Sequence, residues 1–119
     1  MSDMTTLMTA VDSLLRISPR DMIEETIRTK PYLFNDQTQY RRTLKLAIGR
    51  LYQEQIQRLR SHENEHLPSI TQAERKECAR LQGELRNRWV AVMGIIDDPE
   101  RSGMIVELIQ RAKSTKPHG

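Results

Sequence analysis

Aromatic residues make up only 4% of this 119-residue chain, and Cys78 is its single cysteine. One thiol excludes an internal disulfide bond, which agrees with a reducing compartment. No apolar run approaches the roughly 20 residues that cross a bilayer as a helix. The first ten residues contain neither a basic leader nor a continuous apolar segment. We therefore expect a soluble, cytoplasmic protein that does not bind a membrane.

Leucine, arginine, glutamine and glutamate are abundant, and valine and threonine do not form alternating runs. This composition favours helices over strands. With 37% hydrophobic and 29% charged residues, the chain is too apolar to be disordered, and its length suits one domain. We predict an all-α fold with a single helical domain over residues 1–112. Residues 113–119 contain no apolar side chain to bury and are expected to form a flexible tail.

Apolar residues recur at spacings of three and four along most of the chain, which predicts about five helices. Ser18 before Pro19 is a typical helix start, and Thr71 with Glu74 can form a capping box, with Ser69 and Gln72 as the competing pair. Pro31 ends the second helix because the residue before a proline is pushed out of the helical region. The predicted helices run from Ser2 or Asp3 to Arg16, over 19–29, 36–61 and 71–96, and from Pro99 or Ser102 to Ala112. Such helices form an orthogonal or up-and-down bundle.

The segment from Tyr40 to Arg60 combines an apolar stripe with most of the positive charge. Six basic residues and one acidic residue give it a net charge of +5, which exceeds the +3 of the whole chain. Leu46, Tyr52 and Ile56 lie outside the main stripe, and a helix that is apolar on more than one face is buried on more than one face. We predict that this long third helix lies at the centre of the bundle, or that its second apolar face contacts another chain.

Basic residues of the third helix point in several directions on a helical wheel. Relative to Leu44, Arg42 and Arg60 lie at about 160°, whereas Arg50 lies at about −120°. A second basic group, at residues 75–88, is interleaved with glutamates, as is usual for a solvated helical face. A protein-binding surface is therefore favoured, with direct nucleic-acid binding or a homodimer as alternatives. The predicted partner-binding residues are Arg42, Lys45, Leu46, Tyr52, Ile56 and Arg60.

Residues 62–66, His-Glu-Asn-Glu-His, fit the H-E-x-x-H pattern in which two histidines hold zinc and the glutamate activates water. In metalloproteases this motif lies in a buried helix, whereas here its neighbours are polar, Glu65 is charged and Pro68 follows closely. We interpret the motif as a solvated helix end and retain a metal-dependent hydrolase only as a distant alternative. No catalytic residue, metal ligand or cofactor is assigned.

The remaining unusual residues have structural interpretations. Cys78 and Trp89 belong to the apolar stripe of the fourth helix and are expected in the core. No Cys-His-Asn grouping would make Cys78 a nucleophile. Tyr32, Leu33 and Phe34 form a short apolar cluster that is expected to close one end of the core.

The third and fourth helices share an order of features with a family of replication proteins. A basic amphipathic helix containing Arg50 and Tyr52 is followed by a loop and by Leu67-Pro-Ser-Ile-Thr-Gln-Ala-Glu74, which opens another helix. Over about 45 residues this order is similar to the helical domain of archaeal GINS replication subunits. The chain has no room for their small β domain, and Arg58-Leu59 stands where their basic helix commonly ends in Lys-Ile. The resemblance implies replication machinery as one kind of partner.

These observations favour a function without catalysis. The sequence predicts a small helical adaptor or regulatory protein that acts through protein–protein interaction, possibly on nucleic-acid-processing machinery. Its sequence pI of about 9.3 is a mild indication of an acidic partner.

Overall fold

A computed structural model describes residues 3–66 and 68–114, and these residues form five α-helices, three short 3-10 helices and no strand. The all-α prediction is confirmed. None of the described helices is both long enough and apolar enough to cross a membrane. The α-helices are α1 (Asp3–Arg16), α2 (Pro19–Thr29), α3 (Tyr40–Glu65), α4 (Gln72–Asp97) and α5 (Ser102–Ser114), and the 3-10 helices are η1 (Pro31–Phe34), η2 (Gln37–Gln39) and η3 (Pro99–Arg101).

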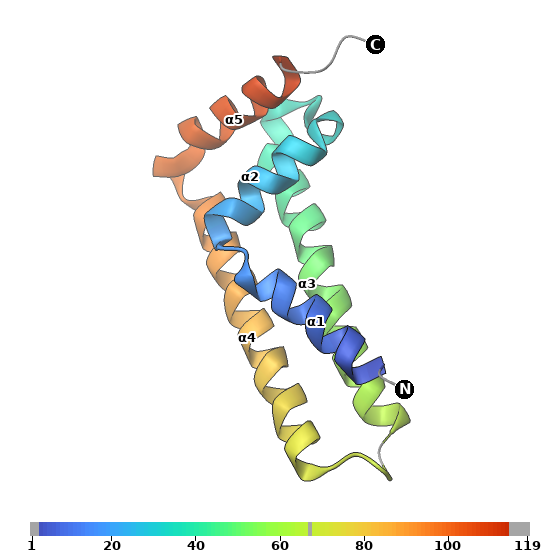
Figure 1. The fold of residues 1–119 in the computed structure, drawn as a ribbon. Coiled ribbons are helices and arrows are strands. Elements are labelled where there is room, and N and C mark those ends of the chain that lie inside the picture. The colour runs from blue at the N-terminus through green and yellow to red at the C-terminus, as the bar shows by residue number, and fades with distance from the viewer. Residues whose placement is uncertain (1–2, 67, 115–119) are drawn as a thin grey trace.

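The two longest helices, α3 and α4, pack against each other as an antiparallel hairpin (Figure 1). Helices α1 and α2 cross one face of this hairpin, and α5 lies next to α2 at the end where α3 begins (Figure 1). The structure measures 52 × 35 × 20 Å. Its shortest dimension corresponds to about two helix diameters. The bundle therefore has two layers, and no described helix covers the second face of the α3–α4 hairpin.

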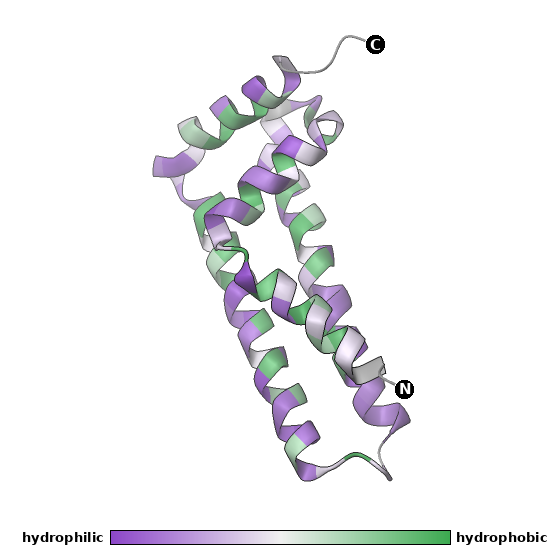
Figure 2. Ribbon diagram, viewed as in Figure 1, coloured by the Kyte–Doolittle hydropathy of each residue, from purple (hydrophilic) through white to green (hydrophobic). Residues whose placement is uncertain are grey.

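An apolar core fills the space between the two layers, and every α-helix contributes to it. Helix α3 runs through its centre, with Leu44, Ile48, Tyr52 and Leu59 fully buried. The prediction of a long central third helix is confirmed. Hydrophobic and hydrophilic segments alternate along the helices in Figure 2, as expected for amphipathic helices with one buried side. The buried apolar residues outside α3 are Leu7, Val11, Met22, Ile23, Ile27, Phe34, Cys78, Leu81, Leu85, Val92, Ile96, Ile105 and Ile109.

Side chains close the starts of α2 and α4 as the sequence predicts. The Ser18 hydroxyl accepts a hydrogen bond of 3.1 Å from the Asp21 amide. At α4 the Glu74 amide donates to Thr71 Oγ1 at 3.0 Å, and the Thr71 amide donates to Glu74 Oε1 at 3.3 Å. These bonds satisfy amides that have no partner within the helix. The capping box and the start of α2 at Pro19 are confirmed.

Several helix ends differ from the prediction. Helix α3 starts at Tyr40, after the 3-10 turn η2, and continues one turn further than expected, to Glu65. Both predicted starts of the last helix occur, because Asp98 caps η3 and α5 then begins at Ser102. Helix α5 continues through Lys113 and Ser114, two residues that were assigned to the tail. The rest of that predicted tail, residues 115–119, lies outside the described residues.

The apolar cluster before α3 is only partly buried. Phe34 is fully buried, whereas Tyr32 is 65% exposed and Leu33 lies at the surface. A single turn of 3-10 helix turns only one of three consecutive side chains toward the core. The cluster therefore closes the core through Phe34 alone. Cys78 is buried as predicted, and Trp89 is half-buried against the core rather than inside it.

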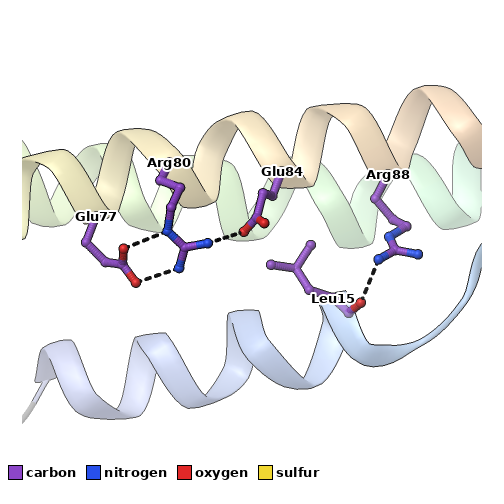
Figure 3. Close-up of polar contacts among 5 residues, drawn as sticks. All are labelled: Leu15, Glu77, Arg80, Glu84 and Arg88. Atoms are coloured by element: carbon purple, nitrogen blue, oxygen red, sulfur yellow. Dashed lines mark hydrogen bonds and ion pairs between the residues drawn. The ribbon is translucent and has the colours of Figure 1, made fainter.

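Arg88 attaches the end of α1 to α4. Its Nη2 donates a hydrogen bond of 3.0 Å to the backbone carbonyl of Leu15, while Arg80, two turns earlier on α4, binds Glu77 and Glu84 (Figure 3). Carbonyls in the last turn of a helix have no partner within it, and a cation there is favoured by the helix dipole. The contact joins residues 73 positions apart and so fixes where α1 lies on the hairpin.

Replacing Arg88 by Ala should lower the free energy of unfolding by about 1.5 kcal/mol, since a charge-assisted hydrogen bond is lost. Arg86→Ala is the matched control, because Arg86 lies on the same helix, is exposed and has no ion pair or side-chain hydrogen bond among the described residues; its effect should stay within about 0.5 kcal/mol. Urea denaturation followed by circular dichroism measures both. Equal losses of stability would contradict the role assigned to Arg88.

Candidate functional site

The face of the α3–α4 hairpin that points away from α1 and α2 is the outer face. On α3 it consists of residues that lie within about 20° of the direction opposite the buried Leu44. On α4 it consists of residues between about 100° and 180° from the buried Leu85, on the side toward α3. All are exposed, except that Gly83 is half-exposed. The outer face comprises Arg42, Leu46, Gln53, Arg60 and Asn64 on α3, and Gln72, Lys76, Ala79, Gly83, Arg86, Val90, Gly94 and Asp97 on α4.

Three contacts between α3 and α4 set their register. Lys45 Nζ lies 2.7 Å from Asp97 Oδ1 near one end, and Gln82 Nε2 donates a hydrogen bond of 2.8 Å to Glu63 Oε1 near the other. Between them Gly49 lies against the ring of Trp89, and a Cβ added at Gly49 would be 3.4 Å from two ring atoms, in van der Waals contact with them.

This register places the two exposed apolar residues of the hairpin near each other. Leu46 is 58% exposed and Val90 is 71% exposed. In the antiparallel hairpin the Gly49–Trp89 contact puts Val90 level with Ile48, about 3 Å from Leu46 along the axis, and the Lys45–Asp97 contact puts Val90 about 9 Å from Leu46. Burying an aliphatic side chain of this size from water contributes about 1.5–3 kcal/mol. A contact that covered both residues would therefore be favourable.

The outer face is positively charged. Arg42, Arg60, Lys76 and Arg86 have no ion pair among the described residues. One carboxylate, Asp97, belongs to this face and is already paired with Lys45. Unpaired surface cations and an exposed apolar pair occur together on this face.

The glutamates of α4 lie on its other side. Glu77 and Glu84 hold Arg80 in ion pairs at 2.6 and 2.7 Å (Figure 3), and Glu74 closes the capping box. The hydrogen bond from Arg80 lowers the pKa of the Glu77 carboxyl. The acids that interrupt the basic residues of α4 in the sequence are therefore separated from Lys76 and Arg86 in space.

Three of the six predicted partner-binding residues, Arg42, Leu46 and Arg60, lie on the outer face, and Lys45 lies at its edge. The prediction that Tyr52 and Ile56 bind a partner is wrong, because their side chains are 0% and 5% exposed. Both point from α3 into the interface with α4, so their position off the main stripe reflects burial against a second helix. A partner cannot contact them in the folded protein.

Sequence reasoning missed the contribution of α4. Lys76, Arg86 and Val90 complete the outer face, although the sequence assigned the basic residues there to an ordinary solvated face. Val90 gave a signal, since it is apolar and lies outside the stripe that runs from Cys78 to Ile96. On a helical wheel of the fourth helix, Lys76 and Arg86 lie away from Glu74, Glu77 and Glu84, whereas Arg80 and Arg88 lie beside these glutamates.

The side chains of the H-E-x-x-H motif contact one another and helix α4. The rings of His62 and His66 stack with centroids 4.4 Å apart, and His66 Nδ1 lies 3.0 Å from the His62 carbonyl oxygen. Glu63 points toward α4 and accepts the hydrogen bond from Gln82. Within residues 3–66 and 68–114 no three His, Cys, Asp or Glu side chains gather where they could hold a metal ion. The geometry gives the hydrolase alternative no support.

Cys78 lies in an environment that disfavours the reactive thiolate. Burial raises the pKa of its thiol, and the negative charges of Glu63, Glu74 and Glu77 raise it further. Nucleophilic cysteines need the opposite, a lowered pKa next to a positive charge. Cys78 is therefore a packing residue.

A groove of about 690 Å³ lies between α2 and α5. Its floor contains apolar Ile17, Ile27 and Leu108, and its rim contains acidic and basic side chains in similar numbers, such as Glu24 and Arg16. This mixture of charges selects neither an anionic nor a cationic ligand. The outer face, where the free charge has one sign, is the better candidate site.

A substitution at Tyr52 tests whether its side chain is buried, as the structure shows. Its hydroxyl is buried without a hydrogen-bond partner among the described residues, and desolvation raises its pKa, although the charge of Arg88 acts in the opposite direction. Tyr52→Phe should leave the free energy of unfolding unchanged or raise it by up to about 1 kcal/mol at pH 7, because an unpaired buried hydroxyl is removed.

The raised pKa also predicts how this difference changes with pH. The phenol ionises at about 10 in the unfolded chain and higher in the folded protein, so the wild type should lose stability relative to Tyr52→Phe as the pH rises above about 10. Urea denaturation at neutral and alkaline pH measures this. Tyr32→Phe, at an exposed tyrosine, should show no such difference. A large loss of stability in Tyr52→Phe at pH 7 would contradict the unpaired hydroxyl.

Comparison with known proteins identifies no relative. No protein-family model, curated protein or solved structure matches this chain, so the likeness of the third and fourth helices to GINS subunits gains no support. The outer face is therefore the feature of the protein that indicates a function.

Proposed function

We propose that this protein is a non-enzymatic helical adaptor or regulatory protein that binds another protein through the outer face. The observation that carries the proposal is the exposure of Leu46 and Val90 among four cations that have no ion pair within the described chain. Protein interfaces typically combine an apolar centre with a polar rim, and arginine is enriched in them.

Direct nucleic-acid binding is the rival function. Its support is the number of cations on one face, since each phosphate that is neutralised adds affinity. Two features of the outer face weigh against it. Leu46 and Val90 lie among the cations, where a sugar–phosphate backbone has no apolar group to bury them. The outer face also contains no aromatic residue on which a base could stack.

Charge reversal on α3 tests the proposal. Arg60→Glu should reduce recovery of the partner at least about tenfold when the tagged protein is isolated from its native cells after cross-linking, because a cation at the rim becomes an anion. Arg58→Glu is the matched control. Arg58 is also an exposed arginine of α3, but it lines the groove beside α1 instead of the outer face.

Quantitative mass spectrometry of the cross-linked material measures the recovery. A protein that is lost with Arg60→Glu and kept with Arg58→Glu supports the proposal. Equal recovery with both variants would contradict it. Loss of the bound material on nuclease treatment would favour the nucleic-acid alternative instead.

A further inference from the structure

We propose that the outer face binds an acidic amphipathic helix of the partner protein, which lies along α3 and α4 between their exposed sides. This inference rests on the proposed function and adds the chemistry of the partner. Three observations carry it: the shape of the α4 side, the position of the apolar pair and the sign of the charge.

Small residues on α4 leave room for a third helix. Ala79, Gly83 and Gly94 belong to the outer face, and a Cβ added at either glycine would meet nothing within 4 Å. Both glycines therefore face open space and do not serve the packing of the hairpin. Each costs about 1 kcal/mol relative to alanine in a helix interior. Small side chains let the backbone of another helix approach closely.

The apolar pair fits one side of an amphipathic helix. Leu46 lies on α3 and Val90 on α4, so the apolar pair is shared between the two helices. A helix laid along the outer face would cover both of them with apolar residues at positions i, i+3, i+4 and i+7. From Arg42 to Arg60 the outer face extends about 27 Å, which corresponds to about 18 residues of a partner helix.

Charge complementarity gives the partner its acidic character. Arg42 lies about one turn beyond Leu46 toward the start of α3. Arg60 on α3, and Lys76 and Arg86 on α4, lie on the other side of the apolar pair, toward the loop that joins the two helices. Carboxylates that flank the apolar stripe of the partner helix would pair with these cations. Arginine suits this role because its guanidinium can bind a carboxylate through two parallel hydrogen bonds.

The same charges argue against a second copy of this chain as the occupant. A two-fold symmetric contact places the same face on both sides. The outer faces of two copies would oppose cations to cations, with Asp97 already occupied by Lys45. Like charges facing each other across an interface are unfavourable.

The test uses a synthetic, fluorescein-labelled peptide of about 20 residues, which as a helix is long enough to extend from Arg42 to Arg60. Its leucines repeat at helical spacing and its flanking positions are glutamate. Fluorescence anisotropy should show binding to the full chain, weakening as salt is raised. A scrambled peptide of the same composition, whose leucines share no face, should bind at least about tenfold more weakly, because it has the charge without the apolar stripe.

Two pairs of substitutions locate the site. Leu46→Ser with Val90→Ser, and separately Arg42→Glu with Arg60→Glu, should each weaken peptide binding at least about tenfold. Leu33→Ser with Arg58→Glu replaces residues of the same types outside the outer face and should change the affinity less than about twofold. All these residues are at the surface, and circular dichroism melts confirm that each variant folds.

Four results would overturn the inference. They are absence of peptide binding, equal binding of the scrambled peptide, equal binding by the outer-face variants, and self-association in sedimentation that Leu46→Ser with Val90→Ser abolishes. Duplex DNA that displaces the peptide and binds the serine variants normally would assign the face to nucleic acid. If the peptide fails while Arg60→Glu still removes the cellular partner, the proposed function stands and the acidic helix alone is rejected.

Discussion

The close packing of α3 against α4 is the constraint on which the rest of the structure depends. The ring of Trp89 on α4 packs against Gly49 of α3. The contacts of Lys45 with Asp97 and of Gln82 with Glu63 hold the register of the two helices. Helices α1, α2 and α5 need this hairpin as a platform, because their own apolar faces are narrow. They cover one face of it and leave the other to solvent (Figure 1).

The hairpin also sorts the charges of its two helices. Arg80 sits between Glu77 and Glu84 on the exposed side of α4, toward α1 (Figure 3). Exposed ion pairs of this kind contribute at most about 1 kcal/mol to stability. Their larger effect is on the distribution of charge, because they engage carboxylates that would otherwise neutralise the neighbouring cations. Arg42, Arg60, Lys76 and Arg86 have no ion pair among the described residues, and these cations are what the proposed acidic partner would recognise.

Much of the candidate site could be predicted from the third helix alone, and the errors have a common cause. Leu46, Tyr52 and Ile56 are all apolar residues off the main stripe, yet Leu46 is exposed and the other two are buried. Their angles on the wheel differ, but an angle has no meaning until the position of the neighbouring helix is known. Helix α4 covers the side of α3 with Tyr52 and Ile56, whereas Leu46 lies on the outer face. The H-E-x-x-H motif also depends on a neighbouring helix, because the position of Gln82 on α4 decides where the Glu63 side chain points.

The sequence by itself determined the helices, their main apolar stripes and the caps at Ser18 and Thr71, because these depend on interactions within a few residues along the chain. The tertiary structure decided which side of each helix remains open. Neither α3 nor α4 alone has a continuous basic and apolar surface, since their charges are scattered around each wheel. Antiparallel packing brings the open side of one beside the open side of the other. That juxtaposition depends on contacts between residues about 20 to 50 positions apart, and no local pattern in the sequence contains it.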